Sequence, residues 1–226
     1  MTTPTKEPYR SVFQRAFYRF VRLIVTIWFV LFYKIRVHNI EQSIQRGSAM
    51  IMANHQSNLD PIVIGALYPG YVSFLAKKAL FKYPPLSWVL FGLDCIPIDR
   101  ESTGIGGMKE TLRRLKKGYR MVLFPEGQRS FDGEMVPLMS GFCALFKRTK
   151  VPIVPIGLDG PFQAWPRGTM IPRPGHIHAV VGKPIYYSDV EHLSDREMTE
   201  YVGERIRECF EQARLLREQK QPTTAS

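Results

Sequence analysis

Short apolar runs with the length of buried strands recur along most of the chain. They cover residues 48–53, 71–76, 95–98, 120–124, 153–158 and 177–181. Segments of helical periodicity lie between them, for example the one in which Met108, Leu112 and Leu115 recur at helical spacing before Gly118. Because strands alternate with helices, the pattern predicts an α/β fold, a single domain with a largely parallel central sheet flanked by helices.

The pattern predicts further helices at residues 61–68, 138–148 and 194–219. The last of these is long and charged, and Ser194 with Glu197 three residues later matches the capping box of a helix start. Pro84 and Pro85 interrupt the stretch after the second strand, where only the short strand at 95–98 is expected.

The N-terminal segment is basic and aromatic. Its uncharged run, Leu23–Tyr33, would form a helix of about 16 Å, whereas the bilayer core is about 30 Å thick. Phe13, Phe17 and Phe20 continue the apolar pattern upstream at helical spacing, with arginines between them. These features favour an amphipathic helix that lies in the membrane interface, with a buried core helix as the alternative.

The chain therefore divides into three expected parts, without internal repeats. They are a basic membrane-associating helix at residues 1–34, an α/β domain at 35–220 and a disordered tail at 221–226.

Composition and charge narrow the function classes. The chain is 45% hydrophobic and 23% charged, which excludes a disordered or collagen-like protein. Its net charge of +11 favours an anionic partner, namely nucleic acid, an anionic membrane surface or a phosphorylated substrate. The basic residues are not interleaved with aromatic ones along one predicted face, which argues against nucleic acid. Cys95, Cys143 and Cys209 lie far apart, which favours a reducing compartment over a disulfide framework.

The most specific candidate for chemistry is the segment from Asn54 to Asp60, between the strand at 48–53 and the following helix. Ligand sites of α/β sheets form at this end of the strands. If the chain turns between His55 and Asp60, the carboxylate can bind one ring nitrogen and leave the other as a general base. Alternatively, Asp60 or Ser57 only caps the helix.

A second polar segment, residues 124–130, follows the strand at 120–124. Gly127 permits close approach of the backbone, Arg129 offers a planar fork for phosphate, and Glu126 can accept a hydroxyl proton or hold Arg129. Arg100, after the strand at 95–98, is another candidate phosphate ligand. The alternatives are a solvated surface turn and a local ion pair between Asp99 and Arg100.

Taken in order, these segments closely resemble the glycerolipid acyltransferase family typified by 1-acyl-glycerol-3-phosphate acyltransferase. The family's NHxxxxD motif matches Asn54, His55 and Asp60, and its FPEGTRS motif matches residues 124–130 with Gln128 in place of threonine. Its apolar block ending in Asp-Arg, its VPIxPI block and two weaker matches fall on residues 96–100, 151–156, 77–80 and 164–168.

The resemblance implies a direct acyl transfer in which His55 is the base and Asp60 orients it. The residues that would hold the glycerol phosphate head are Arg100, Glu126, Gly127 and Arg129, with Lys78 as a further candidate. The donor would be an acyl thioester, either acyl-CoA or an acyl-acyl carrier protein. No metal or other cofactor is implied, because the thioester is already activated.

The expected function is therefore the acylation of 1-acyl-glycerol-3-phosphate to phosphatidic acid, by a membrane-associated enzyme whose active site faces the cytoplasm. Another lysophospholipid or glycerol 3-phosphate as acceptor is the near alternative, since Gln128 lies beside the implied phosphate site. A thioesterase, in which His55 activates water, and a non-catalytic membrane or nucleic-acid binding module are the more distant ones. Nucleic acid is not an expected partner.

Overall fold

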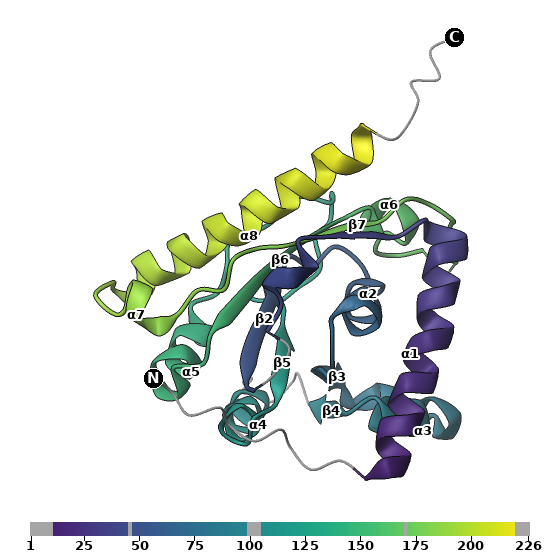
Figure 1. Ribbon diagram of the computed structural model, residues 1–226, viewed down its shortest axis with the longest axis horizontal. Coiled ribbons are helices and arrows are strands. Elements are labelled where there is room, and N and C mark those ends of the chain that lie inside the picture. Colours follow the sequence, from purple (N-terminus) through teal and green to yellow (C-terminus); the bar gives the residue numbers. More distant parts are fainter. Residues whose placement is uncertain (1–10, 45–46, 99–104, 170, 220–226) are drawn as a thin grey trace.

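The protein forms one mixed α/β domain with a seven-stranded sheet (Figure 1). The structure, a computed structural model, describes residues 11–44, 47–98, 105–169 and 171–219, so the expected tail lies outside the described residues. The strands are β1 (Arg36–His38), β2 (Ala49–Ala53), β3 (Ser73–Lys77), β4 (Cys95–Ile98), β5 (Arg120–Leu123), β6 (Ile153–Asp159) and β7 (His178–Val181). Their order is β1-β7-β6-β2-β5-β3-β4, and every pair is parallel except β6 with β7. The predicted largely parallel sheet is confirmed.

Helices cover both faces of the sheet. They are α1 (Val12–Tyr33), α2 (Asp60–Leu67), α3 (Pro84–Gly92), α4 (Ile105–Lys116), α5 (Gly141–Thr149), α6 (Pro161–Ala164), α7 (Tyr187–Val190) and α8 (Asp195–Glu218), with 3-10 turns η1 (Ile40–Gln42) and η2 (Lys78–Lys82). Figure 1 shows α8 lying along β6 and β7 on one side and α2 with α1 on the other. The sheet is thus the middle of three layers.

Alternation along β2 builds a core on each face, as expected for a central strand. Ile51 faces the core shared with α1 and α2. Met50 and Met52 face the core shared with α4, α5 and α8. All five residues of β2 are buried, which explains why the sequence presents this strand as an unbroken apolar run.

Helix α1 is held to the domain by one face only. Tyr18, Phe29 and Tyr33 are buried, and Arg22 Nε donates a 2.9 Å hydrogen bond to the Ala66 carbonyl at the end of α2. The large apolar side chains exposed on α1 are Val12, Phe13, Phe20, Leu23, Ile24, Ile27, Val30, Leu31 and Phe32. By length and composition, α1 could cross a membrane, yet its buried residues from Tyr18 to Tyr33 pack against the domain.

The structure also differs from the expected elements. Helix α3 was not expected, but Pro84 and Pro85 occupy its first turn, where the missing N–H groups leave no helical bond unmade. The helix expected from residue 138 begins only at Gly141, since the Met139 N–H is bonded to the Pro125 carbonyl at 2.9 Å. Strand β7 runs antiparallel to β6, a direction that its apolar pattern does not encode.

Candidate active site

The site is built where β2 ends and the chain turns into α2. His55 Nδ1 lies 2.7 Å from Asp60 Oδ2, so the contact expected between these two side chains is present. The turn between them makes the contact possible, because two residues five apart on a regular helix would point in different directions. His55 Nδ1 is thus engaged by Asp60, and Nε2 is the ring nitrogen that this contact leaves available; the side chain is 12% exposed.

Asp60 is fully buried and does not cap α2. Its Oδ2 accepts hydrogen bonds from the backbone N–H groups of Gln56 and Ser57, at 2.6 and 2.7 Å, and the N-cap position belongs to Leu59. Burial raises the pKa of the Asp60 carboxyl, while His55 and the two backbone donors oppose that rise by stabilising the carboxylate. The capping alternative for Asp60 is therefore wrong.

The segment after β5 encloses His55 from the other side. The Phe124 ring stacks on the imidazole with centroids 4.1 Å apart and planes at 20°. The Ser130 N–H donates to the His55 carbonyl at 2.8 Å, which ties the two motifs together. The ring is therefore fixed by Asp60 at one edge and by Phe124 on one face.

Glu126 contacts the backbone of His55. One carboxylate oxygen accepts the His55 N–H at 2.8 Å, and the other accepts the Val136 N–H at 3.2 Å. The side chain is 4% exposed, and burial raises its pKa to about 7 although both N–H groups favour the charged form. This geometry makes Glu126 a positioning residue for His55, and its expected contact with substrate stays a prediction.

The other expected site residues occupy different places. Gly127 has a φ of +71°, a conformation that glycine adopts without strain, and a Cβ there would lie 2.5 Å from Met139 Sδ. Arg129 is half-buried beside it. Lys78 is exposed at the start of η2, after β3, which β5 separates from β2. Arg100 lies outside the described residues.

Three further polar side chains hold the turn in place. Asn54 Nδ2 donates to the Leu158 carbonyl at 2.9 Å, and Asn54 Oδ1 accepts the Leu158 N–H at 2.7 Å. Gln56 Nε2 donates to the Gly133 carbonyl at 2.5 Å, and Ser57 Oγ donates to the Trp165 carbonyl at 2.8 Å. The signal in the sequence was the run of polar residues directly after a buried strand, but their partners are up to about a hundred residues away.

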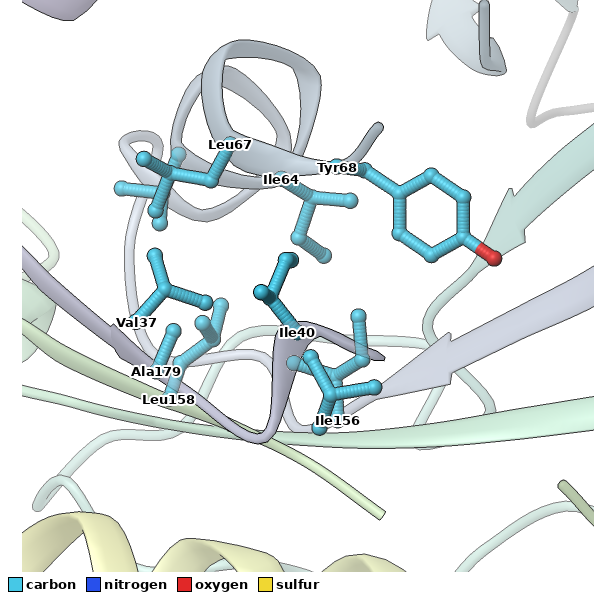
Figure 2. A pocket seen from close by; sticks show the side chains of 10 residues that line it. Val37, Ile40, Ile64, Leu67, Tyr68, Ile156, Leu158 and Ala179 are labelled. Atoms are coloured by element: carbon cyan, nitrogen blue, oxygen red, sulfur yellow. The ribbon is translucent and has the colours of Figure 1, made fainter. Parts of the chain in front are cut away.

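An apolar cavity lies between α2 and the sheet (Figure 2). Figure 2 shows Ile64 and Leu67 of α2 on one side of it and Val37 and Leu158 on the other, with Tyr68 also in its lining. Its volume of about 10 Å³ is close to what one water molecule needs and far below the volume of an acyl chain. Within the described ranges, no group of three or more His, Cys, Asp or Glu side chains could hold a metal ion, and the three cysteines are buried and free.

Comparisons with known proteins agree with the geometry. Residues 34–159 match the family model described as acyltransferase. A Bacillus subtilis protein named 1-acyl-sn-glycerol-3-phosphate acyltransferase is 30% identical over 179 residues, covering 77% of this chain and 87% of that protein. A chloroplastic Brassica napus protein of the same enzyme name is 30% identical over 199 residues, covering 84% of this chain and 58% of that protein.

The chain thus spans little more than half the length of the plant relative. Among solved structures, it resembles the crystal structure of the 1-acyl-sn-glycerophosphate acyltransferase PlsC from Thermotoga maritima, with a TM-score of 0.76 and 24% identity. The match covers 94% of this chain and 81% of that one, and it establishes the fold.

Proposed function

The chain belongs to the acyltransferase family, and on that basis we propose that it transfers a fatty acyl chain from an acyl thioester to the free hydroxyl of 1-acyl-glycerol-3-phosphate. The product would be phosphatidic acid, and the donor would be acyl-CoA or an acyl-acyl carrier protein. The observation that carries the proposal is the His55–Asp60 contact of 2.7 Å, between a fully buried carboxylate and a ring that keeps 12% of its side chain exposed. The curated names of the relatives support this acceptor.

In the proposed reaction, the His55 ring, held by Asp60 and Phe124, acts as the base. The acceptor hydroxyl donates its proton to His55 Nε2 while its oxygen attacks the thioester carbonyl. The Asp60 carboxylate stabilises the imidazolium and keeps the second proton on Nδ1. When the tetrahedral intermediate collapses, the carbon–sulfur bond breaks, and the leaving thiolate takes the proton from Nε2. Each cycle restores the neutral imidazole and needs no metal or other cofactor.

Anion binding is the second part of the proposal. Arg129 beside Gly127, with Arg100 and Lys78, would hold the phosphate of the acceptor, for which a guanidinium offers paired donors. The net charge of +11 suits substrates that carry phosphate and membranes that carry anionic lipids.

The active site would face the cytoplasm from a membrane surface. Helix α1 would lie in the plane of the interface, because the domain packs against its buried face and the opposite face exposes apolar side chains. Exposed Arg15 and Arg19 would contact anionic headgroups. Leu31→Glu in this face should release the protein from phosphatidylglycerol vesicles in a sedimentation assay, whereas Leu215→Glu on the exposed face of α8 should not. Equal binding by both variants would contradict this placement.

Acyl transfer by the reconstituted protein tests the function directly. The protein is incubated with labelled acyl-CoA or acyl-acyl carrier protein and a panel of lysolipids, beside His55→Ala and the control His192→Ala at an exposed position. We expect acylation of lysophosphatidic acid by the wild type and by His192→Ala, but not by His55→Ala. Release of free fatty acid at the same rate without acceptor would instead indicate a thioesterase.

A further inference from the structure

Two exposed side chains near the site have no part in the mechanism above. The Arg167 guanidinium lies over the Phe131 ring, 4.3 Å from its centroid, and is exposed. Phe131 is 68% exposed, which is unusual for a phenylalanine beside a polar site. Within the described part of the chain, no carboxylate is paired with Arg167, so its donors face solvent.

Two hydrogen bonds fix this Arg167–Phe131 pair beside the catalytic turn. Ser130, which precedes the aromatic residue, donates its N–H to the His55 carbonyl at 2.8 Å. On the other side, the Trp165 carbonyl accepts the 2.8 Å hydrogen bond from Ser57 Oγ. Both members of the pair are therefore within two residues of a group bonded to the turn from His55 to Asp60.

The topology of the sheet puts the pair on one side of His55. Arg167 follows α6, which comes after β6, and β6 is the neighbour of β2 on one side. Lys78 follows β3, which lies on the other side of β2 beyond β5. Glu134, in the segment after β5, forms a 2.6 Å ion pair with Arg214 of α8. Since α8 packs along β6, this segment extends towards β6. Lys78 and Arg167 thus follow strands that lie on opposite sides of β2.

We propose that the Arg167–Phe131 pair is a second anion subsite, which binds a phosphate group of a substrate on the β6 side of His55. A guanidinium stacked on a ring keeps its in-plane donors free for phosphate, and the stacking reduces the entropy lost on binding. The inference rests on the proposed function, in which both substrates can carry phosphate. The phosphate belongs either to the nucleotide of an acyl-CoA or to the head of the lysophospholipid.

Arg167→Met tests the subsite, with Arg205→Met as a matched control. Arg205 also lies over an aromatic ring, that of Tyr201 at 5.4 Å, but on α8. We expect Arg167→Met to raise the KM of the substrate that it holds by about tenfold to a hundredfold, from the loss of a charged hydrogen bond. Arg167→Lys should recover part of the loss, because the charge is kept while the planar fork is not.

Truncated substrates identify the source of the phosphate. The effect of Arg167→Met should vanish with acyl-pantetheine if the nucleotide is bound, or with monoacylglycerol if the acceptor head is bound. Either result supports the subsite. A KM change below twofold for both substrates, or one as large in Arg205→Met, would overturn it.

Binding without turnover separates the two proposals. The full chain in detergent is titrated with CoA and, separately, with lysophosphatidic acid by calorimetry. If Arg167→Met weakens binding of one of them at least tenfold, the subsite stands even where the wild type transfers no acyl chain. Equal binding by wild type and Arg167→Met would overturn the subsite whatever the activity.

Discussion

Asp60 and Glu126 are two buried carboxylates that both bind His55, and they bind different parts of it. Asp60 accepts from the imidazole ring, which is the proposed general base. Glu126 accepts from the backbone N–H of the same residue, 71 positions earlier in the chain. The first contact can stabilise a charge that forms during the reaction, whereas the second can only place the ring. Burial of a carboxylate in this site therefore serves two separate purposes.

The largest expected effect is on kcat, and it comes from removing the negative charge of Asp60 beside the His55 ring. In the wild type, Asp60 Oδ2 accepts all three hydrogen bonds, and Oδ1 has no hydrogen-bond partner among the described residues. In Asp60→Asn, the amide oxygen can therefore replace Oδ2. The turn should keep its geometry and lose only the negative charge. We expect kcat to fall about 10²- to 10³-fold, within the range of general acid–base catalysis. Steady-state acyl transfer measures it, and more than a tenth of wild-type kcat would contradict the role of Asp60.

Sequence reasoning found the ring contact because its parts are local. His55 and Asp60 are five residues apart, directly after a short apolar run with the length of a buried strand. The contacts of Glu126 and Asn54 bridge 71 and 104 residues and end on backbone atoms, which no residue pattern specifies. A motif therefore indicates that Glu126 belongs to the site without indicating what it holds.

The same distinction applies to the fold. Buried strands such as β2 and β6 could be predicted, because both of their faces are apolar. Helix α3 could not, since two prolines in a first turn look the same in sequence as prolines in a loop. The apolar run of α1 indicated a membrane helix, but the face that binds the domain depends on partners such as Ala66 in α2.

The second expected effect is on the pH dependence of stability. Glu126 has a folded pKa of about 7, above its ordinary value of 4.5. Between these values the unfolded carboxyl ionises while the folded one keeps its proton, so stability falls as pH rises from about 4.5 to 7 and then levels off. Relative to Glu126→Gln, the wild type should lose about 3 kcal/mol of unfolding free energy over this window. Denaturant unfolding at pH 5 and pH 8 measures the difference, and a constant gap between the two proteins would contradict the burial argument.

A smaller effect is expected on catalysis by Glu126→Gln. The amide oxygen can still accept the His55 N–H, but the amide nitrogen would face the Val136 N–H, so the segment should shift. We expect kcat to fall about tenfold, the cost of roughly one hydrogen bond, with KM for the lysolipid nearly unchanged. A substrate ligand would give the opposite split, with KM raised more than kcat is lowered, and steady-state kinetics distinguishes the two.

The smallest effect should come from the face of the ring that neither carboxylate touches. Phe124 stacks on His55 at 4.1 Å, and Phe124→Leu removes this stacking while it keeps an apolar side chain in place. An aromatic contact contributes about 0.5–1.5 kcal/mol beyond burial, so kcat should fall about two- to tenfold. In Asp60→Asn the ring has already lost its charged partner, and a double-mutant cycle of Asp60→Asn with Phe124→Leu then measures whether the two supports are independent. Additive losses would mean that each support acts alone on the ring, whereas a double variant no slower than Asp60→Asn would mean that the stacking matters only while the carboxylate holds the ring.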